Sequence, residues 1–361
     1  MPKRIAALDG VRGLAALMVF LDHRLSSAHL LYIGGYGVQI FFVLSGFLII
    51  GILHGEQKEI ALRLTTPFAA WRTFLVRRAG RILPLWVTLF ATICLISTAV
   101  PIAHFSAWEI PIYGLFLTNI YIAQVGHFLG PVRQSWSLAV EEQFYLVAAP
   151  LLLALPPQRT RWICLGTVAL AFCWHMSLVM RFPDTLMLRT DSFSNFGFFA
   201  IGGALALRRS SPLSRTAGGI QMVLFLGVAA IPFLPGALAN PVIRQLIQPL
   251  LVALLLAELR DHQDTKLACL LSNHALVGLG TISYGFYLLH EYVTGETLRA
   301  ITFGWIDITH WPSVAQFLPL FVLSVIAAAL SWRYLEKPLL ARARQYQSVP
   351  TRPHCGAPSI A

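Results

Sequence analysis

The stretch ALDGVRGLAALMVFLDHR, residues 7–24, has the apolar character of a membrane-spanning helix. It nevertheless carries Arg12 and His23 among its apolar residues. Ionisable side chains at membrane depth are costly and are usually kept for function. The stretch therefore predicts a membrane fold and places polar chemistry inside it.

The composition of the whole chain agrees with this interpretation. Of its 361 residues, 57% are hydrophobic and only 12% are charged, whereas soluble globular domains carry about 25% charged residues. Apolar segments long enough to span a bilayer recur along the chain. We therefore predict an all-α polytopic membrane protein without a separate soluble domain. The N-terminal sequence MPKRIAALDG lacks a cleavage site of small residues, so no removable signal peptide is expected.

The orientation of the spans follows from the basic residues, which favour the cytoplasmic side. Polar and glycine residues interrupt the apolar segment 111–129. If this segment does not cross the membrane, the basic clusters all fall on the cytoplasmic side. We therefore predict about ten transmembrane helices plus one non-spanning apolar segment near 111–129. Both termini are then cytoplasmic. The eleven apolar segments are 7–30, 36–53, 82–103, 111–129, 137–155, 162–181, 192–207, 218–235, 242–259, 274–292 and 313–334.

Three local expectations accompany this topology. The basic residues between 58 and 81 are expected in an inner loop. Lys337-Pro338 is expected to end the last helix, because proline cannot continue one. The arginines expected outside are Arg133, Arg181, Arg189, Arg244 and Arg299.

The first helix carries a polar face. Arg12 and His23 are eleven residues apart, which is about 1100° and within roughly 20° of three full turns. They therefore share one face, about 16 Å apart along the axis. Asp9 precedes Arg12 by three residues and can pair with it. A neutral histidine can act as a general base near pH 7, or it can simply be satisfied by a backbone carbonyl.

The next two helices add small and basic residues. Gly46 is most simply explained by close helix packing, whereas Ser45 is a candidate for lining a cavity. Arg78 and Arg81 stand three residues apart on one helical face, and Arg77 flanks them. The guanidinium fork suits phosphate oxygens, but anchoring at the inner membrane surface is the simpler explanation for these arginines.

The segment SWSLAVEEQFYL, residues 135–146, forms a second polar island. Ser137, Glu141 and Tyr145 are spaced by four and lie on one helical face. A glutamate in a span usually faces a cavity and finds a partner. Its candidate partners are Arg12, His23 and Arg133. The alternative is a buried ion pair that only fixes the helix register.

Two further features have weaker signals. His290 is equally compatible with an interfacial and a functional role. The cysteines at 94, 164, 173, 269 and 355 are scattered, with no CxxC pattern and no histidine at ligand spacing. We therefore expect neither a disulfide framework nor a metal site.

These pieces, in this order, resemble the acyltransferase family 3 membrane proteins. That family includes bacterial enzymes that acylate cell-surface sugars and secondary metabolites. LDGVRGLAALMVFLDH resembles its first-helix signature, an Arg followed by ten residues and a His, and GVQIFFVLSGFLI its second-helix block. RRAGRILPLW matches its Arg-x-x-Arg element, SWSLAVEEQFYL its Ser-x-x-x-Glu-x-x-x-Tyr element, and LGTISYGFYLLH and YLEKPL its later helices. We therefore expect a family domain over 1–340 and a short, disordered cytoplasmic tail over 341–361.

The resemblance implies the reaction partners. It implies an acyl-CoA donor, most often acetyl-CoA, which binds on the cytoplasmic side as a co-substrate, with no permanently bound cofactor and no metal. The acceptor is expected to be the hydroxyl of a carbohydrate or glycoside. The lipid bilayer is the remaining partner. The net charge of +11 is attributed to membrane orientation, so no nucleic acid is expected.

A mechanism follows as a hypothesis. The predicted catalytic residues are His23 as general base or acyl relay, Arg12 near the thioester, and Glu141 as an orienting carboxylate for His23 or Arg12. The predicted donor-binding residues are Arg77, Arg78 and Arg81. The other cavity candidates are Asp9, Ser45, Ser137, Tyr145 and His290.

The alternative hypothesis is a secondary transporter or flippase of a sugar-containing or lipid-linked substrate. Such a protein also places charged residues on helices near the midplane, but it predicts internal repeats, which the sequence lacks, or a continuous polar lining. Binding of acyl-CoA distinguishes the two classes.

Overall fold

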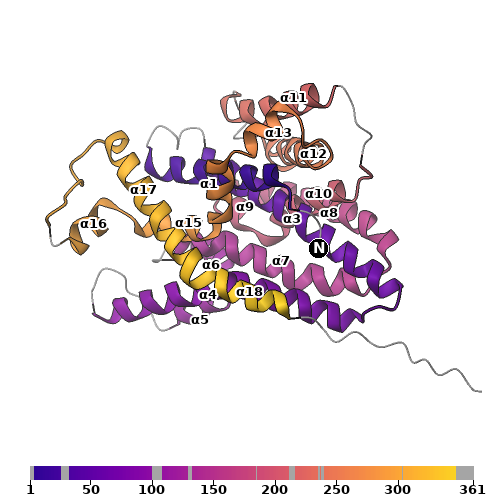
Figure 1. Ribbon diagram of the computed structural model, residues 1–361, viewed down its shortest axis with the longest axis horizontal. Coiled ribbons are helices and arrows are strands. Elements are labelled where there is room, and N and C mark those ends of the chain that lie inside the picture. The colour runs from indigo at the N-terminus through magenta and orange to yellow at the C-terminus, as the bar shows by residue number, and fades with distance from the viewer. Residues whose placement is uncertain are drawn as a thin grey trace, which may run out of the picture.

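The computed structural model describes residues 4–25, 32–99, 108–128, 132–183, 185–210, 216–234, 236, 240–302 and 304–346. All regular elements in these ranges are helices, with no strand among them, which confirms the all-α prediction (Figure 1).

Four helices are long and apolar enough to cross a membrane by length and composition. They are Ile33–Ala61, Pro67–Leu95, Pro157–Arg181 and Ser313–Gln345. Several such helices in one chain are typical of a multi-pass membrane protein. Other expected spans are shorter helices in the described part of the chain, so the count of about ten stays a prediction.

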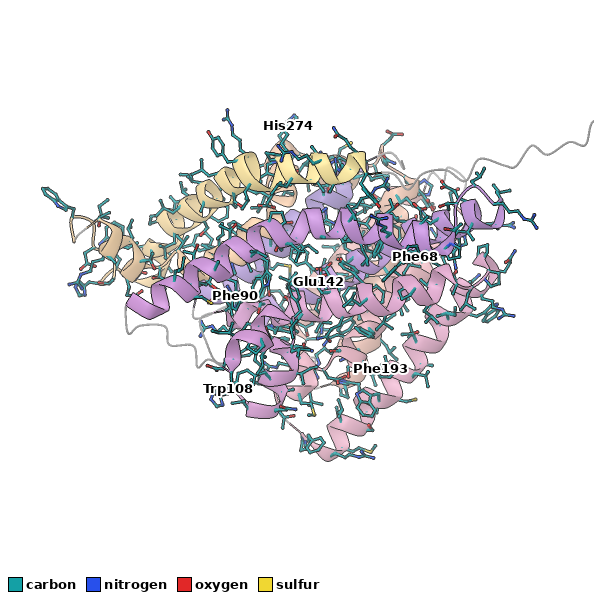
Figure 2. The ribbon with its side chains drawn as sticks, turned by 90° about the horizontal axis from the view of Figure 1, so that it is seen from below. Phe68, Phe90, Trp108, Glu142, Phe193 and His274 are labelled. Atoms are coloured by element: carbon teal, nitrogen blue, oxygen red, sulfur yellow. The ribbon has the colours of Figure 1, made fainter. Side chains whose placement is uncertain are left out.

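The outer surface carries large apolar side chains. Phe68 is 67% exposed and Trp108 is 58% exposed, on separate parts of the molecule (Figure 2). Apolar side chains left uncovered by protein are suited to contact with lipid.

The centre of the fold is α3 (Ile33–Ala61), which packs between α1 (Ala6–Arg24) and α10 (Ser192–Ala206). A Cβ on Gly46 would lie 2.0 Å from the carbonyl oxygen of Phe199, and one on Gly202 would lie 2.0 Å from that of Val43. Only glycine allows such a backbone approach. This confirms the packing role expected for Gly46.

Arg63 lies in a connection between helices, but the other basic residues expected in an inner loop lie in helices instead. Helix α4 (Pro67–Ala99) contains Arg72, Arg77, Arg78 and Arg81, and the connection before it is only residues 62–66. The expectation was wrong because charge alone does not distinguish a loop from the start of a helix. Pro67 opens the helix at a position where its missing N–H is tolerated.

The segment 111–129 is interrupted, as predicted. Its helices are α5 (Glu109–Gly114) and α6 (Thr118–Val125), roughly 9 and 12 Å long. Neither can cross a hydrocarbon core of about 30 Å.

The expected continuous span 274–292 is also broken. It forms α14 (His274–Thr281), α15 (Ser283–Leu289) and a 3₁₀ turn over His290–Tyr292. Gly280 sits where a Cβ would lie 1.8 Å from the carbonyl oxygen of Asp9, and Thr281 bonds back to Val277. Packing against α1 and this back-bonding favour a break that periodicity does not reveal.

The last helix does not end at Pro338. Helix α17 (Ser313–Ser331) continues through a π-helical turn, Trp332–Glu336, into α18 (Lys337–Gln345), which packs against α4 (Figure 1). Pro338 is tolerated because it stands in the first turn of α18. The expected tail residues 347–361 lie outside the described residues.

The remaining helices complete the bundle around α3. They are α7 (Trp136–Leu153), α8 (Thr160–Arg181), α9 (Met187–Thr190), α11 (Ala217–Ala230), α12 (Gln248–Asp261), α13 (Lys266–Leu271) and α16 (Gly295–Ile301). Short 3₁₀ turns cover Arg133–Ser135, Pro157–Arg159 and Ile231–Phe233, and a second π-helical turn covers Ile243–Ile247.

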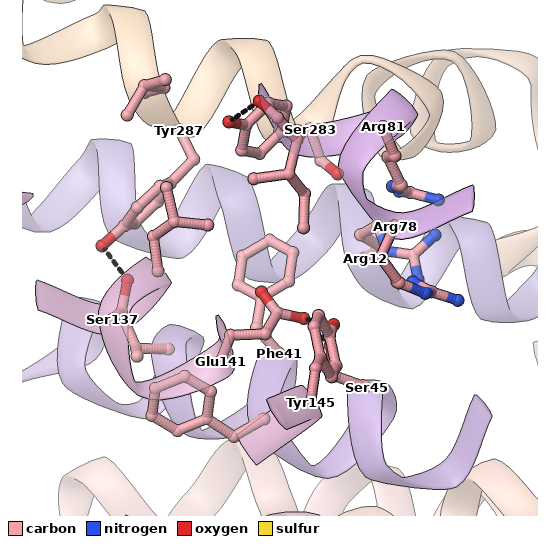
Figure 3. A pocket seen from close by; sticks show the side chains of 16 residues that line it. Arg12, Phe41, Ser45, Arg78, Arg81, Ser137, Glu141, Tyr145, Ser283 and Tyr287 are labelled. Atoms are coloured by element: carbon pink, nitrogen blue, oxygen red, sulfur yellow. Dashed lines mark hydrogen bonds between the residues drawn. The ribbon is translucent and has the colours of Figure 1, made fainter. Parts of the chain in front are cut away.

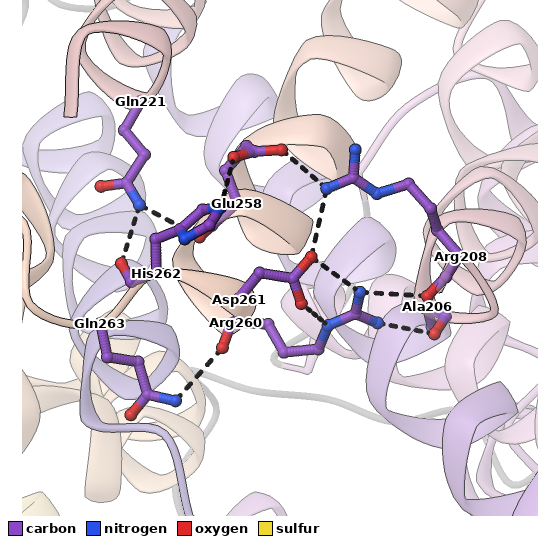
Figure 4. Close-up of polar contacts among 8 residues, drawn as sticks. All are labelled: Ala206, Arg208, Gln221, Glu258, Arg260, Asp261, His262 and Gln263. Atoms are coloured by element: carbon purple, nitrogen blue, oxygen red, sulfur yellow. Dashed lines mark hydrogen bonds and ion pairs between the residues drawn. The ribbon is translucent and has the colours of Figure 1, made fainter. Parts of the chain in front are cut away.

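An ion-pair network ties α12 to the end of α10 (Figure 4). Arg208 lies 2.7 Å from Glu258 and 3.2 Å from Asp261. Arg260 lies 2.8 Å from Asp261 and donates to the carbonyl oxygen of Ala206. The two positive and two negative charges of these side chains balance one another. We therefore assign the network a structural role.

We predict that Gly46→Ala lowers the free energy of unfolding by about 1–3 kcal/mol, because the new methyl group collides with the backbone of α10. Gly51→Ala on the same helix is the control, since a Cβ there meets nothing within 4 Å. Thermal unfolding in detergent measures both. Equal stability of the two variants would contradict the close contact.

Candidate active site

A central pocket collects most of the residues that the sequence singled out. Its open space is about 90 Å³, smaller than the roughly 300–1,000 Å³ that is common for sites of drug-sized ligands. Helices α1, α3, α4, α7 and α15 contribute its walls (Figure 3). The predicted candidates among its lining residues are Arg12, Ser45, Arg78, Arg81, Ser137, Glu141 and Tyr145.

One end of the pocket is basic. Arg12, Arg78 and Arg81 lie together there (Figure 3). Arg12 lies 3.3 Å from Asp9, and the Arg78 guanidinium stands 5.4 Å from the centroid of the Tyr145 ring. Among the described residues, no carboxylate forms an ion pair with Arg78 or Arg81. This end can therefore accept an anionic group.

The middle of the pocket carries Glu141. Its carboxylate accepts hydrogen bonds from Ser45 at 2.6 Å and from Tyr145. The contact joins α3 to α7. Glu141 therefore orients two hydroxyls rather than the imidazole of His23, which corrects the partner expected from the sequence.

The opposite end is lined by hydroxyl groups. Tyr287 donates to the carbonyl oxygen of Gln134 at 3.0 Å. Its hydroxyl has one proton, so Ser137 must donate to Tyr287 across their 2.7 Å contact (Figure 3). The remaining acceptor capacity of Ser137 faces the pocket.

His23 does not line the central pocket. It lies at the C-terminal end of α1, and its Nδ1 is 2.8 Å from Nε2 of His290 and 2.8 Å from Oε1 of Glu291. His23 therefore belongs to a cluster of its own, which we call the histidine cluster: His23, His290 and Glu291.

Hydrogen bonding fixes the protons of this cluster. Nδ1 of His290 lies 2.7 Å from the carbonyl oxygen of Tyr287, which can only accept. Nε2 of neutral His290 is then an acceptor, so Nδ1 of His23 carries the proton. The free lone pair of His23 is left on Nε2, in a side chain that is 34% exposed. That nitrogen can act as a base or a nucleophile.

Two arginines hold the histidine cluster in place. Arg133 lies 3.0 Å from Oε2 of Glu291, and Arg24 donates to the carbonyl oxygen of His290. The sequence interpretation offered Arg133 as a partner of Glu141, and this was wrong. It also gave Glu291 no role. Glu291 directly follows His290 in the sequence, and this adjacency could have suggested one.

The histidine cluster also has the geometry of a possible metal site. Among the described residues, its three ligand atoms lie within 4.8 Å of one another. These ligand atoms already hydrogen-bond with one another. Arg24 and Arg133 also place positive charge beside them, which disfavours a cation. We therefore interpret the cluster as a hydrogen-bonded relay.

Two candidates lie outside the pocket wall. Arg77 is adjacent to Arg78 in sequence but is not among the lining residues. Asp9 pairs with Arg12 and, at 2.5 Å, with Arg4, so it holds the arginine end from behind.

Residues 5–333 match the family model described as an acyltransferase domain. The chain belongs to this acyltransferase family. This confirms the resemblance that the motifs indicated, and the protein is a transferase.

Among its relatives, the chain is 28% identical to a peptidoglycan O-acetyltransferase of Listeria monocytogenes over 93% of its length and 56% of that protein. It is 28% identical to a putative peptidoglycan O-acetyltransferase of Bacillus subtilis over 93% of its length and 55% of that protein. The chain thus spans just over half the length of these two relatives. It is also 26% identical to an acyltransferase of Streptomyces mycarofaciens, over 99% of this chain and 98% of that one. No solved structure matches significantly.

We predict that diethyl pyrocarbonate modifies His23 faster than His290, because His290 is fully buried and its Nε2 is hydrogen-bonded. Peptide mass spectrometry over a time course measures both rates in one sample. A faster reaction at His290 would contradict the assigned lone pair on His23.

Proposed function

We propose that this protein is a membrane O-acyltransferase that moves an acyl group, most often acetyl, from acyl-CoA to a hydroxyl of a carbohydrate or glycosylated acceptor. The observation that carries the proposal is the central pocket. At one end Arg78 and Arg81 form no ion pair with a carboxylate of the described residues, and at the other end hydroxyls lie beside the histidine cluster. The names of the two peptidoglycan relatives support an O-acetyl group and a carbohydrate acceptor.

The basic end suits the phosphates of CoA. Arg78 and Arg81 offer planar forks for phosphate oxygens, and Arg12 stands beside them on the neighbouring helix. Arg12 and His23 are about 16 Å apart along α1. The extended pantetheine arm of CoA would cover this distance through the pocket, with the thioester at the hydroxyl-lined end.

The histidine cluster suits the transfer step. Nε2 of His23 takes the proton of the acceptor hydroxyl, the oxygen attacks the thioester carbonyl, and the C–S bond breaks. The CoA thiolate leaves and receives the proton. In the second possible route, Nε2 itself attacks, releases the thiolate and passes the acyl group to the acceptor oxygen. In both routes Glu291 holds the imidazole with Nε2 outward.

The same proposal orients the chain. The arginine end would face the cytoplasm, where acyl-CoA is made, and the histidine cluster would lie deeper or towards the outer side of a bacterial inner membrane. Both termini would be cytoplasmic. The rival hypothesis of a secondary transporter or flippase finds no support in the family match.

We predict that Arg78→Ala weakens acetyl-CoA binding about 10- to 100-fold, the loss of one or two charge-assisted hydrogen bonds. Arg77→Ala is the matched control, because Arg77 carries the same charge on the adjacent residue but does not line the pocket. Calorimetry on detergent-purified protein measures both. Equal losses would place the donor elsewhere, and no binding of any acyl-CoA by wild type would remove the transferase mechanism.

We predict that His23→Ala abolishes acceptor-dependent release of thiol from acetyl-CoA while leaving the binding of acetyl-CoA intact.

Glu291→Gln should lower kcat by about tenfold or more without raising KM for acetyl-CoA, because the imidazole of His23 loses its orientation. Glu291→Asp should recover part of kcat. An unchanged kcat in Glu291→Gln would show that Glu291 only holds the fold.

A further inference from the structure

A second pocket lies beside the central one. The N-terminal part of α3, the segment from α9 to α10 and the π-helical turn Ile243–Ile247 form it, and its open space is about 10 Å³, enough for about one water-sized group. Val38 and Phe42 line both pockets. Helix α7 also lines both pockets. Trp136 lines the second pocket, and Ser137 lines the central one.

Two arginines enter this pocket without a counter-charge. Arg189 stands over the Tyr32 ring, 4.5 Å from its centroid. Arg244 lies 3.4 Å from the imidazole of His175. In the described part of the chain, neither forms an ion pair with a carboxylate. The nearby Asp191 accepts from the backbone N–H of Ser194, as the cap of α10.

The surroundings fix these arginines in position. Asn195 donates to the carbonyl oxygens of Arg189 and Asp191, at 2.9 and 2.7 Å. Arg244 stands on a π-helical turn, an irregularity that is frequent at functional sites. The backbone of Arg189 and the turn that carries Arg244 are therefore both part of the pocket wall.

A buried polar side chain in the wall is unsatisfied. Gln39 lines the pocket and is 7% exposed, and its amide oxygen has no hydrogen-bond partner. An unsatisfied buried polar group is rare and calls for a ligand or water. The amide nitrogen is not among these fully buried atoms and has no hydrogen bond in the described part of the chain, so its N–H groups can donate to a bound anion.

The pocket borders the central one. Val38 and Phe42 line both pockets. Asp22 of α1 packs against Gly34, since a Cβ on Gly34 would lie 2.7 Å from the Asp22 Cβ. A ligand held in the second pocket is therefore a neighbour of the central pocket across the Val38 and Phe42 wall.

We infer that the second pocket is an acceptor subsite that binds the anionic substituent, a carboxylate or phosphate, of an acidic sugar. Arg189 and Arg244 supply the charge, and Gln39 an additional hydrogen bond. The open space is about 10 Å³, so it takes one oxygen of the acidic group while the sugar ring stays outside. This inference rests on the proposed acyl transfer and adds the substrate class.

The test compares neutral and acidic sugars on the full-length protein in detergent. Glucose, glucuronic acid and glucose 6-phosphate are titrated against wild type, Arg189→Gln, Arg244→Gln and the double variant, with binding followed by calorimetry. Arg181→Gln is the control, an arginine at the end of α8 that does not line the pocket. Unfolding temperatures without ligand, and the charge-retaining Arg189→Lys, separate loss of binding from loss of fold.

We expect an acidic sugar to bind wild type at least about tenfold more tightly than glucose. That preference should disappear in the double variant and survive in Arg181→Gln. A preference for glucuronic acid alone identifies a carboxylate, and one for glucose 6-phosphate alone identifies a phosphate. Equal binding of all three sugars, or a preference that survives the double variant, overturns the inference.

Acetyl-CoA binding is measured on the same samples. If wild type binds acidic sugars but no acyl-CoA, the proposed function fails while the anion subsite stands. If it binds acyl-CoA but shows no acidic preference, the subsite fails and the transferase stands.

Discussion

The direct backbone contact of α3 with α10 is the constraint on which the rest of the structure depends. Gly46 and Gly202 bring the two helices so close that carbonyl oxygens occupy the places of side chains. Lipid offers no hydrophobic drive between helices, so such close packing must hold them together. Because α3 lines both pockets, its position determines which side chains can meet across them.

Charge is distributed unevenly over this framework. The network of Arg208, Glu258, Arg260 and Asp261 balances its own charges, as buried ions require. Arg78, Arg81, Arg189 and Arg244 have no carboxylate ion pair in the described ranges. The contrast separates arginines that hold the fold from arginines available to ligands. A chain with little charged surface would not keep unpaired cations in two pockets without use for them.

Much of the site was predictable from the sequence, because helical spacing fixes which residues share a face. Ser137, Glu141 and Tyr145 line one pocket from one face of α7, as that spacing indicated. Partners across helices were not predictable. Spacing says nothing about which helix approaches which, so Arg12, His23 and Arg133 were offered as partners of Glu141 and Glu291 received no role. The helix break near Ile282 and the continuation through Pro338 depend on tertiary packing and on π-helical geometry, which leave no periodic signal.

The wall shared by the two pockets has a consequence for how the protein can change. Phe42 is almost fully buried and packs on Trp136 and Phe199, and it stands between the two cavities. Phe42 and Val38 thus form one wall between two compartments. A smaller residue at Phe42 would open each cavity into the other, so neither can be enlarged from this wall without changing its neighbour.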